Sequence, residues 1–79
     1  MRILDEEKSK GLERITLYLT ASEASEMRDS LNAIIAAPVG RHEHIPSDDY
    51  RKEVTLCIYE SGALEQFDDR SRKLIIEDA

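Results

Sequence analysis

The side chains best suited to chemistry gather in one short stretch, "RHEHIPSDDYRKEVTLCIY", residues 41–59. This stretch holds both histidines of the chain, its only cysteine and two of its three tyrosines. His42 and His44 are two residues apart, so on a strand their imidazoles share one face. Two imidazoles and the Cys57 thiolate suit zinc, although a structural zinc site usually takes four ligands. A zinc site at His42, His44 and Cys57 is therefore one interpretation of this stretch.

Cys57 beside a histidine also resembles a thiol–imidazole catalytic pair. A reactive cysteine needs surroundings that lower its pKa, and usually a third group that orients its base. A cysteine in the middle of a flat strand has neither. The three glycines, Gly11, Gly40 and Gly62, are too scattered to form a phosphate-binding loop. We therefore expect no catalytic residue, no cofactor and no enzymatic activity.

Two segments have the alternating pattern of half-buried strands: "RITLYLT", residues 14–20, and "EVTLCIY", residues 53–59. Apolar side chains fall on one face of each, namely Ile15, Leu17 and Leu19, and Val54, Leu56 and Ile58. The opposite faces carry Thr16, Tyr18 and Thr20, and Thr55, Cys57 and Tyr59. Both segments are predicted to be strands of one sheet.

A helix is predicted to follow Thr20, because the apolar period changes there from 2 to 3.6 residues. Thr20 and Glu23 have the spacing of a capping box. Pro38 ends the helix, since the residue before a proline is pushed out of the helical conformation. The stripe expected to face the core consists of Ala24, Met27, Leu31, Ile34 and Ile35.

The remaining segments complete the prediction. "MRILDEE" pairs with residues 14–20 in a hairpin that turns near Gly11, and "HEHIP" pairs with residues 53–59 across a turn at "SDDYR". In that second hairpin, residues whose numbers sum to 99 are expected to oppose each other. The tail, residues 68–78, is predicted to be a helix capped by Asp68 or Asp69, and a short strand at "RKLIIE" is the alternative.

These elements make residues 1–79 a single α+β domain of order ββαββα. The expected architecture is a two-layer sandwich, in which one long helix packs on one face of a four-stranded antiparallel sheet of order 1-2-4-3. The other face stays open. It is predicted to carry Thr16, Tyr18, His42, His44, Thr55, Cys57 and Tyr59.

This open face mixes aromatic rings, imidazoles and a thiol with hardly any charge, and tyrosine is enriched in binding patches. It predicts contact with another protein or with a second copy of the chain. Alternatively, the same cross-strand pairs only stabilise the sheet, or the C-terminal segment covers them.

Composition excludes several other partners. The net charge is −6 and lysine and arginine form no cluster, so nucleic-acid binding is not expected, whereas a basic protein partner is electrostatically favoured. No apolar run approaches the roughly 18 residues of a membrane span. The charged N-terminal residues lack the apolar core of a signal peptide. These features predict a cytoplasmic protein.

The run "LYLTASEASEMRDSLNAI", followed by "HEHI" and "EVTLCIY", resembles small immunity proteins of bacterial polymorphic toxin systems. In those proteins a strand, a Leu-rich helix, an H-x-H strand and a further strand occur in this order. The resemblance covers roughly residues 14–59. It implies a cytoplasmic protein that neutralises a toxin by binding it, and it assigns no site residue.

Overall fold

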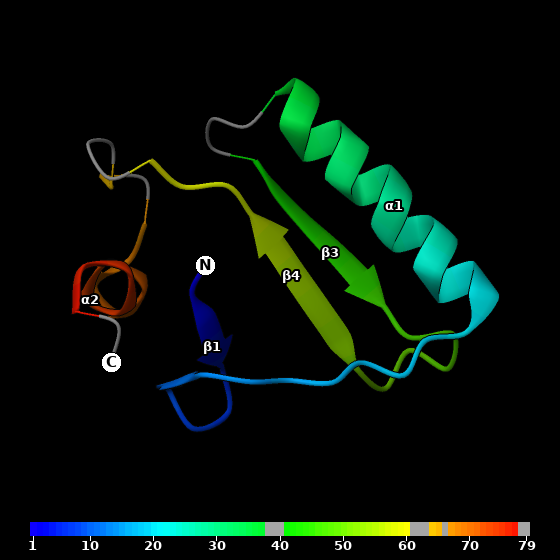
Figure 1. The fold of residues 1–79 in the computed structure, drawn as a ribbon, viewed down its shortest axis with the longest axis horizontal. Helices are drawn as coiled ribbons and strands as arrows, with labels where there is room; N and C mark the ends of the chain where they lie inside the picture. Colours follow the sequence, from blue (N-terminus) through cyan, green and yellow to red (C-terminus); the bar gives the residue numbers. More distant parts are fainter. Residues whose placement is uncertain (38–40, 61–63, 66, 78–79) are drawn as a thin grey trace. The chain divides into compact units, whose positions relative to one another are not determined.

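The computed structural model describes residues 1–37, 41–60, 64–65 and 67–77. The chain divides into two compact units, one of Met1–Leu17 with Glu60–Ala79 and one of Tyr18–Tyr59. Within the described residues each unit contains a two-stranded antiparallel sheet and one helix, so the chain is α+β. Figure 1 traces the chain through both units.

The unit Tyr18–Tyr59 is a helix packed on a hairpin. It contains α1 (Ala21–Ala36), β3 (His42–Pro46) and β4 (Glu53–Cys57). The register of the hairpin is the predicted one, with His42 opposite Cys57 and His44 opposite Thr55. The turn between the strands is closed by a hydrogen bond from the Tyr50 amide to the Ser47 carbonyl at 2.9 Å.

The N-terminus of α1 is also as predicted. The Thr20 hydroxyl accepts from the Glu23 amide at 3.2 Å, and the Glu23 carboxylate accepts from the Thr20 amide at 2.8 Å, which completes the capping box. The helix ends at Ala36 with Ala37 as its cap. Pro38, expected to end the helix, lies outside the described residues.

The stripe that α1 turns to the sheet differs from the predicted one. Ile34 is 2% exposed, and Ile45 of β3 is 4% exposed. Ala24, Leu31 and Ile35 were expected in the core but are exposed. Two strands about 4.8 Å apart are too narrow to cover an apolar stripe of more than 100°. One flank of the helix therefore stays uncovered by its own hairpin.

The other unit contains β1 (Ile3–Asp5), β2 (Lys10–Leu12) and α2 (Asp69–Glu77). The tail is thus a helix over Asp69–Glu77, while the predicted last residue, 78, lies outside the described residues. The Asp68 carboxylate caps this helix by accepting from the Ser71 amide at 2.7 Å. Phe67 and Leu74 are buried.

The first hairpin turns earlier than predicted. The Asp5 carboxylate accepts from the amides of Glu7 and Lys8 at 3.0 and 3.1 Å, which fixes a tight turn before Ser9. Gly11 consequently lies within β2, opposite Leu4, and not in the turn.

The predicted four-stranded sheet of order 1-2-4-3 is wrong, because the described strands form two separate two-stranded sheets. The Asp5 turn pairs β1 with Lys10–Leu12, so the chain reaches residues 14–20 with no strand left to pair locally. Those residues belong to no described ladder, and Ile15, Leu17 and Leu19 are 41–51% exposed. Alternation supplied an apolar face, but a strand also requires a hydrogen-bonded neighbour.

Candidate functional site

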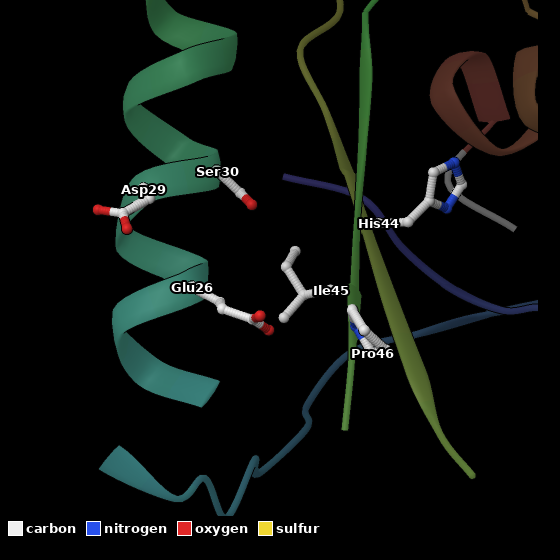
Figure 2. A pocket seen from close by; sticks show the side chains of 6 residues that line it. All are labelled: Glu26, Asp29, Ser30, His44, Ile45 and Pro46. Carbon is white, nitrogen blue, oxygen red and sulfur yellow. The ribbon is translucent and has the colours of Figure 1, made fainter. Parts of the chain in front are cut away.

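The β3–β4 hairpin has two different faces. Figure 2 shows Ile45 pointing toward α1 and the neighbouring His44 pointing away from it, as strand alternation requires. Because the register pairs His42 with Cys57 and His44 with Thr55, these side chains share the second face. We call it the outer face. It consists of His42, His44, Glu53, Thr55 and Cys57.

His44 is the best-defined group on the outer face. Its Nδ1 lies 2.9 Å from a Glu53 carboxylate oxygen and 3.0 Å from the Thr55 hydroxyl. A carboxylate only accepts hydrogen bonds, so Nδ1 carries a proton in this arrangement. In the neutral ring, Nε2 is then left as a hydrogen-bond acceptor. Two residues of β4 therefore set the tautomer and the orientation of the His44 ring, which β3 carries.

His42 and Cys57 oppose each other next to this pair. The rings of His42 and His44 have centroids 6.5 Å apart and are tilted by 52°. Cys57 is exposed as a residue, yet neighbouring atoms partly desolvate its thiol, and this desolvation raises the pKa of Cys57. A raised pKa keeps the sulfur as a thiol at neutral pH, whereas a nucleophilic cysteine requires the opposite shift.

The residues considered for zinc do not form a ligand set in the structure. Within the described part of the chain, no group of three or more His, Cys, Asp or Glu side chains is placed to hold a metal ion. His42, His44 and Cys57 share a face, but the Nδ1 of His44 is engaged by protein oxygens.

Four of the seven residues predicted for the open face lie together on the outer face: His42, His44, Thr55 and Cys57. Thr16 and Tyr18 do not join them, since their segment is in no described ladder, and Tyr18 is 93% exposed. Tyr59 follows the end of β4 and is half-buried. The face is therefore narrower than predicted, because it has two strands in place of four.

Sequence reasoning missed a network that joins the hairpin turn to the start of α1. The Asp48 carboxylate accepts from the hydroxyls of Thr20 at 2.6 Å and Ser22 at 2.8 Å, while the Asp48 amide donates to Glu23 at 2.8 Å. These hydroxyl hydrogen bonds hold the pKa of Asp48 below its ordinary value. The only sequence signal was an Asp in a predicted turn. An Asp in a turn does not indicate that its carboxylate binds the cap of a helix more than 20 residues away.

A hollow of about 210 Å³ lies between α1 and β3. Figure 2 shows Glu26, Asp29 and Ser30 on its helix side and Ile45 and Pro46 on its strand side. The two carboxylates make its rim acidic, and Arg28 offsets one of them by pairing with Asp29 at 3.1 Å. The flank of α1 that carries Glu26 and Asp29 is therefore the one that lies beside β3.

Comparisons with known proteins give no family assignment. No family model, curated protein or solved structure matches the chain. Among the described residues, neither helix has the length and apolar character needed to cross a membrane.

Proposed function

We propose that this protein acts without catalysis, by binding another protein through the outer face. The observation that carries the proposal is the contrast between the two faces of the hairpin. In the unit Tyr18–Tyr59, α1 covers one face, and none of the described elements of that unit covers the other. This outer face presents two imidazoles, a hydroxyl and a thiol, and its one carboxylate, Glu53, is engaged by His44.

Such a surface suits a protein partner better than an ion or a small molecule. It combines ring surface with hydrogen-bonding groups, and it carries little charge that must be desolvated on binding. His44 is held in one orientation by Glu53 and Thr55, so little side-chain freedom is lost when a partner binds. The net charge of −6 favours a basic partner by accelerating encounter.

Neutralisation of a basic toxin in the cytoplasm is one specific form of this function. It rests on the resemblance of residues 14–59 to small immunity proteins and on the acidity of the chain. Stabilisation of the hairpin by the same cross-strand pairs is the simpler alternative, and partner capture by outer-face variants separates the two.

The test uses the tagged full chain to capture partners from a lysate of the source organism. His44→Lys places a cation at the centre of the outer face. Asn32→Lys is the matched control, because it introduces the same cation on the exposed side of α1. We expect one stoichiometric partner to bind the wild type and the control, and His44→Lys to retain about tenfold less of it. Circular dichroism checks that both variants fold.

Equal capture by His44→Lys and the wild type would exclude the outer face as the binding surface. Absence of any stoichiometric partner for the wild type would contradict the proposed function. A partner that is toxic when expressed alone would identify toxin neutralisation.

A further inference from the structure

The segment 14–20 has strand chemistry but no strand partner. Its apolar side chains Ile15, Leu17 and Leu19 fall on one face and are 41–51% exposed. None of the described strands pairs with this segment, whose last residue, Thr20, is engaged as the N-cap of α1. Unsatisfied backbone groups and a row of exposed apolar side chains are the features that lead a strand to add to a sheet edge.

A suitable edge exists in the same chain. In the described sheet β4 pairs with β3 alone, so its second edge has no neighbour. Above that edge, α1 has an uncovered apolar flank, because Leu31 is 42% exposed and Ile35 is 68% exposed. Both an unpaired edge and an unpaired strand segment are thus present, each complementary to the other.

The helix flank is on the β4 side for a geometric reason. At 100° per residue, Leu31 and Ile35 lie on one flank of α1, and Glu26 and Asp29 lie on the opposite flank. The acidic flank borders the hollow with Ile45 and Pro46 of β3. α1 also contacts β3 more than β4. Leu31 and Ile35 therefore lie on the flank of α1 that is nearer to the free edge of β4.

One antiparallel register satisfies both sequences. With residue numbers summing to 73, Leu17 opposes Leu56 and Leu19 opposes Val54, so the apolar side chains meet beneath the helix flank. The same register puts Tyr18 opposite Thr55 on the outer face. No like charges face each other in this register, because Arg14 opposes Tyr59 and Glu53 opposes Thr20.

We infer that a second copy of this chain occupies the β4 edge: residues 14–19 of each copy add as a strand to β4 of the other. The strand is donated between copies, which differs from the in-chain four-stranded sheet that the structure rules out. A second copy fits because the chain carries both halves of the junction, and a twofold exchange closes with both halves filled. Two added strands and two helix flanks bury an area on the order of the roughly 1,600 Å² of a standard interface.

The dimer is independent of the proposed partner-binding function but extends its surface. Tyr18 and Thr16 of one copy would lie beside Thr55 and Cys57 of the other, which enlarges the outer face. Each copy carries a net charge of −6, so salt should strengthen the association by screening the repulsion between copies.

Sedimentation velocity over a dilution series tests this inference with three variants. The segment variant is Leu17→Asp with Leu19→Asp, the flank variant is Leu31→Asp with Ile35→Asp, and the control is Asn32→Asp on the exposed side of α1. We expect the wild type and the control to dimerise, and each double variant to dimerise at least about tenfold more weakly.

Mixing the two double variants gives the sharpest result. In a mixed pair, both defects fall in one junction, and the other junction joins an intact segment to an intact edge. We therefore expect the equimolar mixture to form dimers more strongly than either variant alone. A monomeric wild type at every concentration would overturn the inference. So would dimerisation of the segment variant at wild-type strength, or a mixture that associates no better than its components. The His44→Lys variant should still dimerise, so a failure of partner capture does not affect this test.

Discussion

Two segments of this molecule have the same alternating pattern but different structures. Glu53–Cys57 is a strand in a five-residue ladder, whereas residues 14–20 are in no described ladder. Both place branched apolar side chains on one face and polar or small side chains on the other. The difference lies in what each segment can reach. A ladder forms where a turn brings a neighbour into place, and an alternating pattern alone does not supply that neighbour.

The turn before β4 shows how a neighbour is supplied. The Ser47 hydroxyl accepts from the amides of Arg51 and Lys52 at 3.2 and 3.0 Å, and it donates to Asp49 at 2.6 Å. The turn is also tied to the α1 cap through Asp48. Before residue 14, the comparable turn is used by the short β1–β2 hairpin, which leaves the following residues unpaired.

The largest effect on stability is expected when substitutions between α1 and β3 are compared with a substitution in the unpaired segment 14–20. Ile34→Ala and Ile45→Ala should each lower the free energy of unfolding by about 2 to 5 kcal/mol, because each leaves a cavity between α1 and β3. Leu17→Ala should cost less than about 1 kcal/mol in dilute protein, since its side chain is already 44% exposed. Urea denaturation measures all three. Equal losses at Leu17 and Ile45 would mean that residues 14–20 are packed as firmly as β3.

A smaller effect is expected at the turn. Ser47→Ala removes the hydroxyl that accepts from two backbone amides, which should cost about 1 to 2 kcal/mol. Ser25→Ala, on the exposed side of α1, is the control and should be neutral or slightly stabilising because alanine favours helix. If thermal melting shows the two changes to be equivalent, the turn does not hold the hairpin together.

The turn–cap network also predicts an acid dependence. The pKa of Asp48 is lowered in the folded state from its ordinary 3.8, first by the Thr20 hydroxyl and then by the Ser22 hydroxyl. Its contribution to stability is therefore fully present above about pH 3.8 and is lost as the pH falls through the lower folded pKa. Asp48→Asn should be less stable than wild type at neutral pH, and the difference should shrink in acid. A difference independent of pH in thermal melts would show that the carboxylate charge is not what caps α1.

The smallest expected effect concerns the backbone of the same turn. Tyr50 has φ 59°, in the left-handed region that favours glycine, and its side chain is exposed. Tyr50→Gly should therefore raise the free energy of unfolding by up to about 0.5 to 1 kcal/mol. Thermal melting of this variant should show a small gain, and a clear loss would mean that the ring itself contributes to the hairpin.

Local interactions were predictable from the sequence, and the assembly of the sheet was not. Thr20 and Glu23 identified the start of α1, and alternation on both sides of a short turn gave the register of His42–Pro46 with Glu53–Cys57. The failures were non-local. The side chain of Asp5 stabilises a turn that the alternating pattern does not predict. Leu31 and Ile35 were assigned to a core, but a sheet of two strands is too narrow to cover them. The outer face kept its four central residues because it depends only on that local register.

Hydrogen exchange of the backbone amides over a concentration series tests the central claim most directly. The account predicts that β3 and β4 have protected ladder amides at every concentration, whereas residues 15–19 exchange rapidly in dilute protein and become protected as copies associate. Protection of residues 15–19 that is already complete at high dilution would place them in a strand within one chain. That result would contradict both the two-stranded hairpin and the exchange of strands between copies.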